Sequence, residues 1–105
     1  MVRKEGQASF AMSLDEAYRR SAQALVILGA TVTKEDAATG TIEARIPMSL
    51  TSWGENLAIQ ITGVDDDALV SVTSSSNWST TLFDFGKNQQ NVTRLLDWLR
   101  RSQDR

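Results

Sequence analysis

The sequence predicts an α+β fold, a two-layer sandwich in which two helices cover one face of an antiparallel sheet of about five strands. Apolar residues alternate with polar residues in several short stretches, and apolar residues recur at helical spacing in two longer ones. Turn-forming residues separate the alternating stretches, which is typical of hairpins. The expected order is strand, helix, four strands, helix, and the 105 residues suit a single domain covering 1–105.

Two helices are predicted, at about 14–28 and 87–102. Ser13 and Glu16 have the spacing of a capping box, and Gly29 supplies the residue that ends the first helix. Both segments carry a stripe of residues at helical spacing that would face the sheet. These stripes are Leu14, Ala17, Tyr18, Ser21, Leu25 and Leu28 in the first helix, and Val92, Leu95, Leu96 and Leu99 in the second.

The strands are predicted from period-two alternation. The clearest stretch is 41–46, which ends at Pro47 because proline cannot donate to a sheet ladder. Residues 63–67 and the serine run 74–76 are interpreted as turn chemistry. The other alternating stretches are 8–12, 31–33, 56–62 and 70–74, and a weaker pattern at 77–83 leaves open whether that segment is a paired strand.

The sheet face away from the helices is expected to be polar. Its predicted residues are small or hydrophilic, so this face can meet water or accept a partner or a second copy of the chain. They are Glu43, Arg45, Gln60, Thr62, Ser71 and Thr73.

Composition excludes several kinds of chemistry. The chain has no cysteine, which removes disulfides and thiolate nucleophiles, and no histidine, which removes the commonest general base and metal ligand. We therefore expect no metal and no cofactor. The net charge of -2 and the pI near 5.0 argue against nucleic acid as a partner. Without a signal-like segment or a long apolar run, a cytoplasmic protein that does not enter a membrane is expected.

Two motifs have simpler explanations than metal binding. The tripeptide Asp84-Phe85-Gly86 lacks the other kinase motifs, so we interpret it as a helix start with Asp84 or Asn88 at the cap. The acids Asp65 to Asp67 lack the ligand register of a calcium loop and are expected to form a hairpin turn.

The predicted binding residues are Trp53, Glu55, Trp78, Arg45 and Gln60. The two tryptophans lie at strand ends or in loops, where a large aromatic side chain either closes the core or anchors a ligand. If there is a ligand site, we expect it between the Trp53 loop and the 74–80 segment.

Residues 52–99 resemble a family of small bacterial domains of unknown function. The resemblance is carried by the stretches SWGE, SVTSSS and DFGKNQQNV, and the family pattern often has arginine where this chain has Asn77. The element order is also similar to that of the half-repeat of the TATA-box binding protein. Both resemblances imply a fold more than an activity.

The leading hypothesis is a noncatalytic module that binds a protein or a small ligand and acts as a homo-oligomer. The absence of a catalytic constellation and the polar open sheet face favour it. The alternative is a small enzyme that uses carboxylate or hydroxyl chemistry near Trp53 and Trp78, with Glu55 or Asp84 as the carboxylate.

Overall fold

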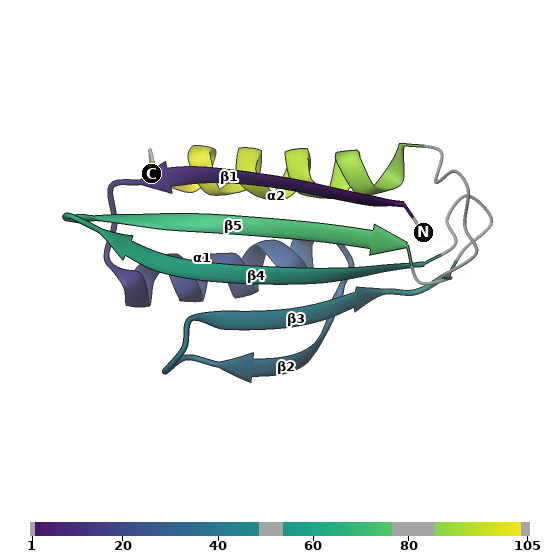
Figure 1. Ribbon diagram of the computed structural model, residues 1–105, viewed down its shortest axis with the longest axis horizontal. Helices are drawn as coiled ribbons and strands as arrows, with labels where there is room; N and C mark the ends of the chain where they lie inside the picture. Colours follow the sequence, from purple (N-terminus) through teal and green to yellow (C-terminus); the bar gives the residue numbers. More distant parts are fainter. Residues whose placement is uncertain (1, 49–53, 77–85, 104–105) are drawn as a thin grey trace.

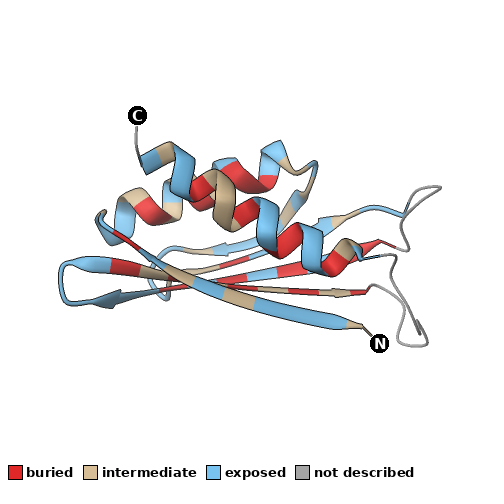
Figure 2. Ribbon diagram, turned by 90° about the horizontal axis from the view of Figure 1, so that it is seen from above, coloured by how far each residue is buried: buried red, intermediate tan, exposed pale blue. Residues whose placement is uncertain are grey.

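A computed structural model describes residues 2–48, 54–76 and 86–103 and confirms the predicted α+β fold (Figure 1). Both helices lie on the same side of one five-stranded antiparallel sheet (Figure 2). The elements are β1 (Arg3–Phe10), α1 (Leu14–Ile27), β2 (Thr31–Asp36), β3 (Thr41–Ile46), β4 (Glu55–Val64), β5 (Asp67–Ser76) and α2 (Lys87–Gln103). In the described part of the chain, neither helix is long and apolar enough to cross a membrane.

The sheet has the strand order β1-β5-β4-β3-β2. Strands β2 to β5 are joined in sequence as antiparallel neighbours, whereas β1 pairs with β5, the last of these strands in the chain. The strands β1 and β2 that flank α1 in sequence therefore form the two opposite edges of the sheet.

The core lies between the sheet and the helices. Strand residues paired in register share a face, so Ile42, Ile59 and Val72 form one inward row. The helices cover such rows with their buried residues, which include Ala17, Ala24 and Leu25 from α1 and Val92, Leu95 and Leu99 from α2. Figure 2 shows buried positions, in red, in both the sheet and the helices.

Gly6 lets α2 pack closely on β1. A Cβ added at this position would lie 2.6 Å from Cγ1 of Val92 and 3.3 Å from Cδ1 of Leu96. The predicted first strand, 8–12, missed this part of β1 because Lys4 and Gly6 occupy inward-facing positions without apolar side chains. The strand in fact starts at Arg3 and ends at Phe10, before Met12.

Other boundaries also differ from the predictions. Residues 74–76 belong to β5 and do not form a turn, because Ser74 and Ser76 face the helix layer and find polar partners there. The turn predicted at 63–67 is reduced to Asp65 and Asp66, since Val64 pairs with Asp67. Strands β2 and β4 are longer than predicted, and the segment 77–83 lies outside the described residues.

The helix ends follow the predicted chemistry only in part. Ser13 accepts a hydrogen bond from the backbone N-H of Glu16, and Gly29 has φ +82°, as expected for a helix stop. Leu14 is 48% exposed rather than in the core. At the start of α2, the carbonyl of Gly86 accepts from the N-H of Gln90, whereas Asn88 is buried and does not cap the helix. Asp84 lies outside the described residues.

Candidate functional site

The open face is the side of the sheet that no helix covers. The register places two rows of paired residues across four strands of this face, and we call them the first and second charged rows. The first charged row is Arg3, Ser75, Asn56 and Arg45, and the second is Glu5, Thr73, Ala58 and Glu43. The rows are charged at both ends and have small or neutral residues at the centre.

The charges of the open face are accessible. Arg3 contacts Glu5 at 2.6 Å and Lys34 contacts Glu43 at 3.8 Å, with more than half of each side chain exposed. Such exposed pairs contribute little to stability, so their charges remain available to a partner. Among the described residues, Arg45 makes no ion pair.

Two shallow hollows lie on the open face around Ala58, where the central side chains are short. One has a volume of about 240 Å³ and borders Asn56, Thr73 and Ser75. The other has a volume of about 280 Å³ and borders Lys34, Gln60 and Ser71. Because both hollows are open and adjoin one another at Ala58, Glu43 and Thr73, they form a broad surface rather than an enclosed pocket.

Glu55 lies on the other side of the sheet, in a buried polar cluster between β4, β5 and α2. Its carboxylate accepts a hydrogen bond of 3.0 Å from Nδ2 of Asn91, which also donates to Oγ of Ser74 at 3.1 Å. Asn88 accepts from Oγ of Ser74 at 2.7 Å and donates to Oγ of Ser76 at 3.0 Å. All five of these side chains are buried.

The polar cluster fixes the first turns of α2 over the ends of the strands. Nδ2 of Asn88 also donates to the carbonyl of Val2 at 3.1 Å, which ties α2 to the start of β1. Buried amides and hydroxyls are costly to leave without hydrogen bonds, so a shift of α2 that broke these contacts would destabilise the fold. The sequence signal for this cluster was the pair Asn88 and Asn91, three residues apart on the buried side of an amphipathic helix, and Asn91 was not among the predicted site residues.

The structure separates the predicted binding residues. Arg45 and Gln60 lie on the open face, Glu55 lies on the helix side, and Trp53 and Trp78 lie outside the described residues. Arg45 pairs with Asn56 across the sheet, four residues from Gln60 along β4. Gln60 also has a structural role, because its Nε2 donates to the carbonyl of Thr39 at 2.8 Å. Whether these residues bind a ligand stays a prediction.

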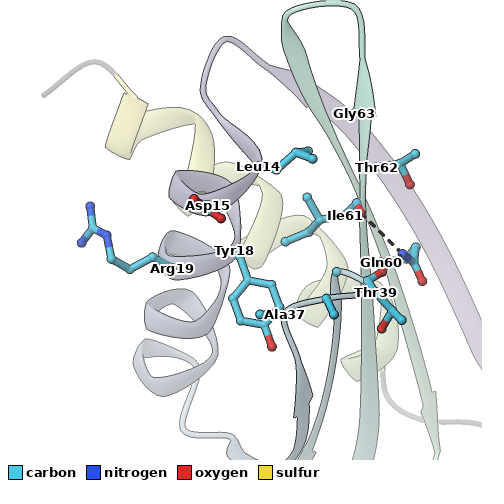
Figure 3. Close-up of a pocket in the computed structure, with 12 residues that line it drawn as sticks. Leu14, Asp15, Tyr18, Arg19, Ala37, Thr39, Gln60, Ile61, Thr62 and Gly63 are labelled. Carbon is cyan, nitrogen blue, oxygen red and sulfur yellow. Dashed lines mark hydrogen bonds between the residues drawn. The ribbon is translucent and has the colours of Figure 1, made fainter.

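A cleft of about 340 Å³ lies between the first turns of α1, the β2–β3 turn and the end of β4 (Figure 3). Leu14 and Ile61 face one another across it, and Tyr18 and Ala37 also line it. The turn is held against β4 by the N-H of Ile61, which donates to the carbonyl of Gly40 at 2.8 Å. A Cβ at Gly40 would lie 2.4 Å from the carbonyl oxygen of Ile61, so glycine permits this approach.

Acidic groups dominate the charge around the cleft. Burial raises the pKa of the Tyr18 hydroxyl, and the nearby charges of Glu35 and Asp36 raise it further. Glu16 binds two arginines, and the hydrogen bonds from Arg19 and then Arg20 lower the pKa of its carboxyl to about 2.

Comparison with known proteins identifies the fold. No protein-family model matches the chain and no curated protein matches it, so the family resemblance stays a prediction. An uncharacterised protein from Bacillus thuringiensis is similar in structure, with a TM-score of 0.73, 8% identity, and coverage of 99% of this chain and 100% of its own. The Aha1 dimer from Colwellia psychrerythraea has a TM-score of 0.65, 18% identity, and coverage of 99% and 95%.

A third similar structure is the di-domain ARO/CYC BexL, with a TM-score of 0.61 and 14% identity. The similarity covers 98% of this chain and 44% of the larger protein. At such low identities, the three likenesses show the fold alone.

Proposed function

We propose that this chain is a noncatalytic interaction domain that binds a second copy of itself through the open face. The observation that carries the proposal is the arrangement of opposite charges in two adjacent rows. Across the four strands β1, β5, β4 and β3, Arg3 and Arg45 stand at the ends of the first charged row and Glu5 and Glu43 at the ends of the second, with Lys34 of β2 beside Glu43.

The two rows are complementary to themselves under one two-fold axis. In this arrangement two open faces stack against each other. The two-fold axis lies in the plane between the two sheets, runs perpendicular to the strands, and passes midway between the two rows. Each first row then lies over the second row of the other copy, which brings Arg3 over Glu5 and Arg45 over Glu43. A two-fold interface uses the same patch on both copies, so each charge contact occurs twice.

The area of the open face and its short central side chains are compatible with such an interface. At the usual strand and residue spacings, five strands of six to ten residues present about 600 Å² per copy, or about 1,200 Å² in total. That total lies at the lower end of stable protein interfaces. The short central residues Ala58, Thr73 and Ser75 allow two sheets to approach closely.

One structural neighbour supports self-association of a domain with this fold. The solution structure of Aha1 from Colwellia psychrerythraea is that of a dimer, and its fold is similar to that of this chain. The support is limited to the fold, and the interface proposed for this chain depends on its own charge pattern.

Two charge-reversed variants test the proposal. Arg45→Glu leaves two acids at positions 43 and 45, and Glu43→Arg leaves two bases, so each variant alone places like charges opposite each other. In a mixture, an acidic copy faces a basic copy at both contacts. We expect each variant alone to dimerise about tenfold to thirtyfold more weakly than the wild type, because two exposed charge contacts become repulsive.

Native mass spectrometry of the mixture, with one variant isotopically labelled, measures the three possible dimers. The proposal predicts a heterodimer in large excess over both homodimers. Arg94→Glu is the matched control, because it makes the same charge change on an exposed position of α2 in the helix layer and should leave dimerisation unchanged. A statistical mixture of dimers, or a wild type that stays monomeric at high concentration, would refute the proposed interface.

A further inference from the structure

The cleft between α1, the β2–β3 turn and β4 is separate from the open face. In the described part of the chain, the space between α2 and the sheet is filled by side chains such as Val72, Val92 and Leu95, which are all buried. The cleft of about 340 Å³ lies apart from this packed region and has room for a small ligand. Its volume lies at the lower end of the range of about 300–1,000 Å³ typical of ligand pockets.

The walls of the cleft suit an apolar body. Leu14 is 48% exposed and presents apolar surface to the cleft. Its Cδ atoms would lie 3.6 Å from a Cβ added at Gly63, so the absence of a side chain at Gly63 leaves room at this end. Ile61 and the ring of Tyr18 complete the apolar surface (Figure 3).

The charges around the cleft favour a cation. Asp15 lines the cleft from the first turn of α1, and among the described residues it has no ion pair. Glu35 and Asp36 are close enough to Tyr18 to raise the pKa of its hydroxyl, which indicates a negative potential beside the ring.

The groups that would attract an anion are already engaged. Arg19 also lines the cleft, but its guanidinium contacts both carboxylate oxygens of Glu16, at 2.5 and 2.7 Å, and points away from Leu14 and Ile61 (Figure 3). The first turn of α1 offers backbone N-H groups, but Ser13 accepts from one of them and the acidic residues of this turn offset the helix dipole.

We infer that this cleft binds a small organic cation, with an apolar or aromatic body against Leu14, Ile61 and Tyr18 and its ammonium group beside Asp15. The hydroxyl of Tyr18 donates to the carbonyl of Thr41 at 3.2 Å, which holds the ring at the side of the cleft. An ammonium group near the ring face would gain a cation–π contact in addition to the carboxylate.

Benzylamine, benzyl alcohol and benzoate are probes of similar shape that carry a positive, neutral and negative group at pH 7. Each is titrated into the ¹⁵N-labelled protein while the amide shifts of residues around the cleft, such as Leu14, Tyr18, Ala38 and Gly63, are recorded. We expect saturable shifts with benzylamine, at least threefold weaker binding of benzyl alcohol, and no saturable binding of benzoate.

Two variants and one control locate the site. Asp15→Asn should weaken benzylamine binding about threefold to fivefold, since an exposed charge contact is lost. Gly63→Ala should weaken it as well, because the added methyl occupies the end of the cleft. Asp97→Asn removes the same charge from α2 and should leave the affinity unchanged.

Three outcomes would overturn the inference: equal binding of benzoate and benzylamine, shifts centred away from the cleft, or an affinity that neither Asp15→Asn nor Gly63→Ala changes. None of them bears on the open face. The ligand inference and the dimer proposal therefore succeed or fail separately.

Discussion

Replacing Asn88 by alanine should destabilise the fold strongly, because the side-chain amide of Asn88 is fully buried and hydrogen-bonded. Ser74 would lose the acceptor that it contacts at 2.7 Å, and Ser76 would lose a donor at 3.0 Å. The carbonyl of Val2 would still accept from the N-H of Ser76, and Ser74 would keep its bond from Asn91. The loss therefore includes a hydrogen bond at each of the two hydroxyls, with a small cavity in addition.

The expected loss is about 3 kcal/mol in the free energy of unfolding, because an unsatisfied buried polar group costs about 1–3 kcal/mol and the cavity adds to it. Urea unfolding followed by circular dichroism measures it, as a lower midpoint with an unchanged slope. Gln89→Ala is the control on the next residue, which is exposed and bonds only to Thr93 among the described residues. If Asn88→Ala and Gln89→Ala unfold within about 0.5 kcal/mol of each other, the cluster does not hold α2 in place.

Three further changes test local features. Glu16→Gln should destabilise the protein at neutral pH, because a carboxyl with a lowered pKa stabilises the fold only while it is ionised. The difference in unfolding free energy between variant and wild type should shrink from about pH 4.5 toward pH 2. A difference that stays constant over this range would contradict that role of Glu16. Asp65→Gly should stabilise the β4–β5 turn by about 0.5–1 kcal/mol, since Asp65 has φ +56°, and a lower melting temperature would count against it. Gly6→Ala should cost about 1–3 kcal/mol by denaturant unfolding, because the new methyl meets Val92, and a neutral result would show that α2 can shift without cost.

Much of the fold could be predicted because local chemistry and burial agree along most of the chain. Residues 41–46 alternate cleanly and form β3 up to Pro47, and the Ser13 cap starts α1 at the predicted residue. The predictions failed where inward positions carry polar or small residues. Gly6 in β1 and the serines at the end of β5 face the helix layer, so apolar alternation did not reveal them.

The candidate sites were less accessible to sequence reasoning. The polar open face followed from alternation, and Arg45 and Gln60 lie there as expected. Glu55 was grouped with these residues as a predicted binding residue, but its side chain faces inward from β4 and lies on the other face of the sheet. The cleft depends on how the β2–β3 turn approaches α1 and β4 in space, and no local pattern in the sequence encodes that approach.

The most direct test of the central claim is a sedimentation-equilibrium measurement of the untagged wild-type chain over a wide concentration range, at low and at high salt. The account predicts a reversible monomer–dimer equilibrium that weakens at high salt, because the contacts across the open face join opposite charges. A single species with the monomer mass at every concentration, or a dimer that salt does not affect, would contradict it.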